Sequence, residues 1–127
     1  MAISFAYDAQ RAILFTKAHG LITFEAIEDH IRREAEAGHV QCREVFDALD
    51  ASTNLTTAEV KVLVRDLLRR TKDEPFGPTA VVTASDVLFG MTRMLETLLE
   101  LNNGPALAAF RTPDEAIAWL LAGAPRR

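Results

Sequence analysis

Hydroxyl groups are concentrated in one short segment of the sequence, where they could accept a phosphate. Residues 50–59 read DASTNLTTAE and contain Ser52, Thr53, Thr56 and Thr57. A phosphate on Ser52 or Thr53 would lie near the first turn of a following helix, whose free N–H groups and dipole favour anions. The simpler interpretation is a Ser/Thr turn that links a strand to a helix cap. Ser52 and Thr53 are therefore candidate phosphoacceptors.

Further polar residues follow the predicted strands, where an open α/β sheet gathers ligands along its carboxyl edge. Together with helix N-termini they would form a pocket for a small molecule, an anion or a lipid. Ser85, His19 and Asp50 could be arranged as a hydrolase triad, but Ser85 lacks a Gly-x-Ser-x-Gly elbow and is better explained as a helix cap. We therefore expect no enzyme activity, with a hydrolase as the less favoured alternative. The candidate ligand edge consists of His19, Asp50, Ser52, Asn54, Ser85 and Arg111.

The residues best suited to bind a metal do not have the spacing of a known site. His30, His39 and Cys42 match no zinc template. His30 also falls outside the apolar stripe of its predicted helix, which we place at Phe24, Ile27, Ile31 and Ala35. The sequence therefore predicts neither a metal site nor a cofactor.

An aromatic side chain on the polar side of a predicted helix marks a candidate interaction surface. Phe89 projects beside Arg93, and Gly90 would allow another backbone to approach closely. The ring either packs under a neighbouring loop or contacts a protein partner or a second copy of the chain. Phe89, Gly90 and Arg93 are thus a candidate interface, including that of a homodimer. A basic face on the helix 56–72 is most simply solvated, with contact to an anionic partner or to phospholipid headgroups as the alternative.

Apolar periodicity predicts the elements that position these residues. Short segments with alternating or unbroken apolar character indicate strands, and longer ones with a repeating apolar stripe indicate helices. Thr56 and Glu59 have the spacing of a capping box at the start of one helix. The predicted strands are 3–7, 11–17, 42–49, 79–84 and 106–110, and the predicted helices are 23–38, 56–72, 85–102 and 112–123.

The resulting order, ββαβαβαβα, predicts an α/β fold. Strand and helix alternate after a first hairpin, which favours a mostly parallel five-stranded sheet with one antiparallel N-terminal strand. The unbroken apolar runs 79–84 and 106–110 suit strands covered by helices on both faces.

Length and composition limit the classes of protein to consider. The 127 residues suit one domain, which we place at 1–122, followed by a flexible tail at 123–127. A net charge of −4 disfavours nucleic-acid binding, and the single cysteine excludes an internal disulfide. The N-terminus lacks the pattern of a signal peptide, and no apolar run is long enough to cross a bilayer. We therefore expect a cytoplasmic protein.

The element order, the hydroxyl-rich turn and the segments VVTASDVLFGMTRMLETL and AFRTPDEAIAWL resemble the SpoIIAA-like, or STAS-like, family of bacterial domains. The resemblance covers nearly the whole chain and implies a non-enzymatic regulatory or protein-interaction domain. In anti-sigma-factor antagonists of this fold, a kinase phosphorylates the serine of an Asp-Ser-(Ser/Thr)-Gly turn. The corresponding stretch here, Asp50 to Asn54, has an inserted alanine and no glycine, and Ser52 is the nearest match. A small-ligand, anion or lipid-binding domain with its pocket at the carboxyl edge is the alternative.

Overall fold

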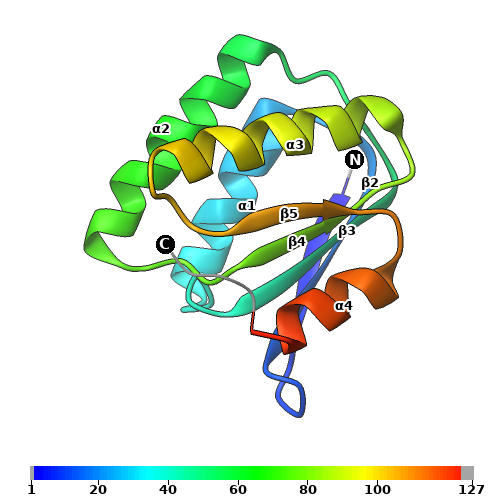
Figure 1. Cartoon of the computed structure of the whole chain (residues 1–127), viewed down its shortest axis with the longest axis vertical. Helices are drawn as coiled ribbons and strands as arrows, with labels where there is room; N and C mark the ends of the chain where they lie inside the picture. The colour runs from blue at the N-terminus through cyan, green and yellow to red at the C-terminus, as the bar shows by residue number, and fades with distance from the viewer. Residues whose placement is uncertain (1, 124–127) are drawn as a thin grey trace.

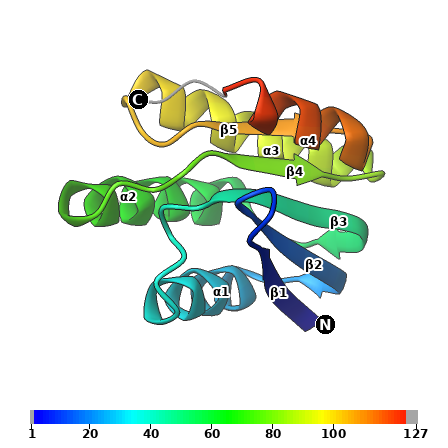
Figure 2. The same cartoon turned by 90° about the horizontal axis from the view of Figure 1, so that it is seen from below.

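A five-stranded sheet organises the chain, and its strands lie side by side in sequence order (Figure 2). The computed structural model describes residues 2–123, so residues 124–127 of the predicted tail lie outside the described part. β1 runs antiparallel to β2, and the remaining neighbours are parallel. The predicted element order and mixed sheet are therefore confirmed. The strands are β1 (Ala2–Asp8), β2 (Ile13–Ile22), β3 (Arg43–Thr53), β4 (Thr79–Val82) and β5 (Leu107–Phe110).

Three helices cover one face of the sheet and a fourth covers the other (Figure 1). Each of the first three connects neighbouring parallel strands, and the strand order always advances in the same direction. Because such crossovers are almost always right-handed, all three helices lie on the same face. The helices are α1 (Phe24–Glu36), α2 (Thr57–Asp73), α3 (Asp86–Leu101) and, on the opposite face, α4 (Pro113–Leu121). Among the described residues, no helix combines the length and apolar character that a bilayer crossing requires.

Short polar side chains start every helix where the sequence predicts a start. Thr23, Thr56, Ser85 and Thr112 each accept a hydrogen bond from a backbone N–H in the first turn of the helix that follows. Thr56 also forms the predicted capping box with Glu59. These local bonds fix where α1, α2 and α3 begin above the sheet.

β2 and β3 extend farther than the sequence predicts. Gly20, Leu21 and Ile22 pair with the segment Ala51–Thr53, beyond the predicted strand ends at residues 17 and 49. Polar residues and glycine favour loops locally, but here the backbone hydrogen bonds between two long neighbouring strands outweigh that preference. The prediction of a turn directly after residue 49 is therefore wrong for its first part, because Asp50, Ser52 and Thr53 lie within β3. His19, which is predicted to follow the second strand, lies within β2.

Candidate functional site

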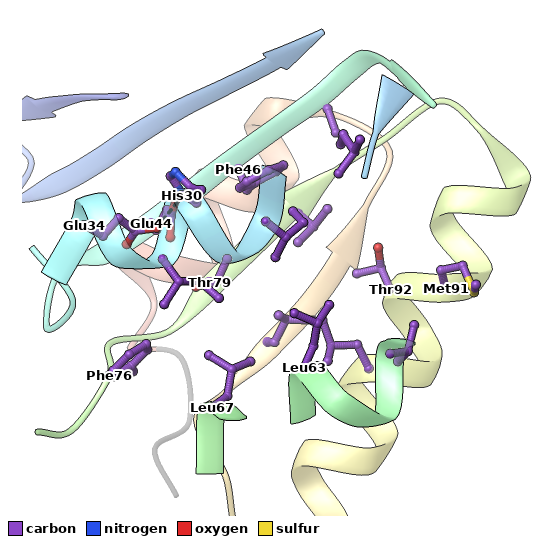
Figure 3. A pocket seen from close by; sticks show the side chains of 18 of the residues that line it. His30, Glu34, Glu44, Phe46, Leu63, Leu67, Phe76, Thr79, Met91 and Thr92 are labelled. Atoms are coloured by element: carbon purple, nitrogen blue, oxygen red, sulfur yellow. Dashed lines mark hydrogen bonds and ion pairs between the residues drawn. The ribbon is translucent and has the colours of Figure 1, made fainter. Parts of the chain in front are cut away.

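A cavity of about 140 Å³ lies between the sheet and helices α1, α2 and α3. Its wall is mainly apolar: Leu63 and Leu67 come from α2, Met91 and Leu95 from α3, and Phe76 from the segment before β4. Figure 3 shows several of these side chains directed into the same space. A dry apolar cavity of about 150 Å³ is known to bind benzene, so this one is large enough for a small apolar group.

Helix α1 presents two ionisable side chains to this cavity. The face that meets the sheet carries residues spaced at i, i+3, i+4 and i+7, namely Ile27, His30, Ile31 and Glu34, and all of them line the cavity. His30 is only 3% exposed and Glu34 only 8%. The predicted stripe is therefore rotated: His30 lies on the buried face, whereas Ala35 is exposed.

Glu44 reaches the same place from the start of β3. Alternation along the strand puts its side chain on the same face as Phe46 and Ala48, and all three line the cavity. The Thr16 hydroxyl on β2 donates a hydrogen bond of 2.5 Å to Glu44 Oε2. Because both side chains are buried, this bond fixes the orientation of the carboxylate.

The ionisable side chains meet at the imidazole Nε2 atom of His30 (Figure 3). This atom lies 3.0 Å from Glu44 Oε2 and also contacts Glu34 Oε1. The rings of Phe5 and Phe46 pack edge-on against the imidazole, with ring centroids 5.9 and 5.4 Å away. Within the described residues, no lysine or arginine reaches either carboxylate. We refer to His30, Glu34 and Glu44 as the buried triad.

Burial and mutual contact shift the pKa values of two triad members. Burial lowers the pKa of His30, but hydrogen bonds and charge interactions with Glu34 and Glu44 together outweigh it and raise this pKa to about 9. Burial, reinforced by the neighbouring Glu44 and opposed by His30, raises the pKa of Glu34 to about 7. At neutral pH the imidazole is therefore protonated, and Glu34 is close to its titration midpoint.

The residues of the predicted ligand edge lie outside the cavity wall. His19 and Asp50 face each other as register partners of β2 and β3. Ser85 caps α3, and Arg111 donates a hydrogen bond of 2.8 Å to the carboxylate of Asp86. His19 and Asp50 therefore form one local group on β2 and β3, and Ser85 and Arg111 form another at the start of α3. Among the described residues that line the cavity, none belongs to the set His19, Asp50, Ser52, Asn54, Ser85 and Arg111.

The two candidate phosphoacceptors differ in accessibility. Ser52 is exposed on β3. The Thr53 hydroxyl donates to the Ile22 carbonyl at 2.9 Å and accepts from the Leu55 N–H at 3.1 Å. Thr53 therefore has a structural role at the end of the strand, while phosphorylation of Ser52 stays a prediction.

The predicted interface residue Phe89 is half-buried and partly covered by the chain itself. The Arg111 guanidinium carbon lies 4.1 Å from the centroid of its ring, within the range of a cation–π contact. Arg93 forms an ion pair of 3.9 Å with Glu96, and Gly90 is exposed. Phe89 thus packs under the segment that follows β5, and its contact with a partner stays a prediction.

The buried triad is a candidate site that the sequence analysis does not predict. In the described part of the chain, the group whose ligand atoms have metal-site spacing is His30, Glu34 and Glu44, rather than His30, His39 and Cys42. His39 instead stacks on the ring of Tyr7. Two signals pointed to the triad: the spacing of His30 relative to Ile27 and Ile31, and the alternation that puts Glu44 on the face of Phe46.

No protein-family model and no curated protein matches this sequence. A solved structure is nevertheless similar in fold: an uncharacterized protein from the DUF3478 family, from Shewanella loihica PV-4, which is described as having a SpoIIAA-like fold. The similarity has a TM-score of 0.58 at 20% sequence identity and covers 94% of this chain and 92% of the other. Taken with the confirmed element order and sheet, it shows that this chain has a SpoIIAA-like fold.

Proposed function

We propose that this domain binds a small apolar molecule, or the apolar end of a larger one, without catalysing a reaction. The observation that carries this proposal is the cavity of about 140 Å³ with its mainly apolar wall. Protein interiors contain few voids larger than a water molecule, and an unfilled cavity lowers stability. A bound molecule would restore the missing contacts, so the cavity favours a binding role.

The wall of the cavity offers surface that a ligand would cover. Met91 and Leu95 are only half-buried, although both side chains are directed away from the polar side of α3. Phe76 is half-buried as well and lies in the irregular segment before β4. Each square ångström of apolar surface that a ligand removes from water contributes about 25 cal/mol to binding. Methionine also adjusts its shape readily, which suits a wall that must close around a ligand.

The proposal can be tested with fluorobenzene, whose size matches the cavity. ¹⁹F NMR titration of the wild-type protein should show saturable binding. Leu95→Trp puts a larger side chain into the cavity and should weaken binding at least tenfold. Leu101→Trp is the matched control, because Leu101 lies on the same helix but is 74% exposed. Absence of binding to the wild type, or binding that Leu95→Trp leaves unchanged, would reject the proposal.

A regulatory role through a protein partner is a second candidate. It is supported by the exposure of Ser52 near the C-terminal end of β3 and by the fold. A phosphate there would add between one and two negative charges and three strong acceptor oxygens. Intact-mass measurement of the protein isolated from its native cells should then show a phosphorylated fraction that is lost in Ser52→Ala. A uniformly unmodified protein would argue against this role.

A further inference from the structure

One imidazole nitrogen and two carboxylate oxygens converge at the wall of the cavity. His30, Glu34 and Glu44 each offer one ligand atom, and these atoms all lie within 4.8 Å of one another. We propose that the buried triad is a binding site for a divalent transition-metal ion, with Zn²⁺ as the ion that its ligands fit best. Imidazole nitrogen and carboxylate oxygen are both ordinary Zn²⁺ ligands. This proposal goes beyond apolar ligand binding and does not depend on it.

His30 Nε2 has more contacts than one hydrogen can serve. His30 Nε2 can carry a single hydrogen, yet it contacts an oxygen of Glu34 and an oxygen of Glu44. One hydrogen cannot be donated fully to both oxygens. An ion at the point where the three atoms converge would be coordinated by a lone pair from each of them.

The charges of the triad also favour a divalent cation. Metal binding displaces the protons of its ligands, and two ionised carboxylates with a neutral imidazole then carry a charge of −2, which a divalent ion would neutralise. All three side chains are buried, and a buried charge without a partner is costly. Among the described residues, no lysine or arginine contacts Glu34 or Glu44, so in the metal-free protein the protonated imidazole of His30 is the cation between the two carboxylates.

Parts of the surrounding structure position the ligands, although His30 Nδ1 has no hydrogen-bond partner among the described residues. His30 and Glu34 are four residues apart on α1, a spacing that puts two ligands on one face of a helix. The Thr16 hydroxyl orients Glu44 with its 2.5 Å hydrogen bond, the kind of outer contact that tunes metal ligands. All three triad residues also line the cavity. An ion held by three protein ligands would therefore keep a coordination position open toward the cavity.

The test is isothermal titration of the full-length, chelator-treated protein with ZnCl₂. The wild type should bind one Zn²⁺ per chain, and excess Mg²⁺ should not compete, because Mg²⁺ demands octahedral oxygen ligands. Glu34→Gln and Glu44→Gln keep the side-chain shape and should each weaken binding at least tenfold. His39 and Cys42 are the other nearby pair of residues that could bind a metal. The control His39→Gln disrupts this pair and should leave the affinity unchanged, because His39 is not part of the triad.

A measurement on the wild type keeps the proposal falsifiable if the glutamine variants fail to fold. An anomalous difference map at the zinc absorption edge should show a peak about 2.0–2.2 Å from His30 Nε2 and from an oxygen of each glutamate. Absence of one-to-one binding by the wild type, a zinc peak elsewhere, or unchanged affinity in folded Glu34→Gln and Glu44→Gln would overturn it.

Discussion

The two faces of the sheet are packed in different ways. Under α4, the side chains of Ile13, Val82 and Leu120 are almost completely buried, and Phe110 packs against Trp119. Under α1, α2 and α3, the same sheet carries a cavity, half-buried apolar side chains and three buried ionisable groups. One face therefore resembles an ordinary hydrophobic core, while the other combines buried apolar side chains with a cavity and ionisable groups.

This difference suggests a division of roles between the faces. Close packing under a single short helix contributes stability through dispersion and apolar burial. The opposite face is crossed by three helices that follow from the sheet order, and it leaves room between them. We infer that the α4 face supports the fold so that the other face can retain a cavity and buried polar groups for binding.

The largest effect should come from the closely packed face. Leu120→Ala removes a side chain that is 1% exposed and should lower the free energy of unfolding by about 3 kcal/mol, because the surrounding core cannot collapse into the space. Leu121→Ala is the control, because the side chain of Leu121 is 52% exposed. This substitution should change the free energy of unfolding by less than about 0.5 kcal/mol. Urea denaturation measures both. Equal losses of stability in the two variants would show that Leu120 is not packed more closely than an exposed residue.

A second effect should come from pH on the cavity face of the metal-free protein. Glu34, with its pKa raised to about 7, binds a proton in the folded state that the unfolded chain has released, so stability falls as pH rises from about 5 to 7. The proton on His30 stabilises the fold fully below its ordinary pKa of 6.5, and this contribution is lost as pH rises through about 9. The two effects have the same sign, so stability should fall throughout the range from pH 5 to pH 9.

Denaturation midpoints measured across this pH range provide the check. The denaturation midpoint of Glu34→Gln should change less between pH 5 and pH 7 than that of the wild type, because the amide does not titrate. A wild-type stability that rises over the same range would contradict the ionisation that we assign to the triad.

The smallest effect should come from truncating the cavity wall. Leu95→Ala should cost only about 1 kcal/mol, less than Leu120→Ala, because a half-buried side chain beside an existing void loses fewer contacts. The same urea experiment measures this difference. A loss as large as that of Leu120→Ala would show that Leu95 is packed as tightly as the opposite face.

The sequence predicts the scaffold better than the site, for a physical reason. Helix starts at Thr23, Thr56, Ser85 and Thr112 depend on bonds within a few residues, so they can be found locally. The ends of β2 and β3 depend on pairing between distant segments. A prediction from local polarity therefore puts these strand ends too early. The triad escaped prediction because charged residues are assumed to be exposed unless they are paired, and Glu44 is distant in sequence from the α1 residues that it contacts.

The most direct test of the account is a crystal structure of the protein under xenon pressure, since xenon binds dry apolar cavities. We predict a xenon atom against Leu63 and Leu95, between the sheet and α1–α3, and none under α4. Side chains that fill this space and leave no xenon site there would contradict the account.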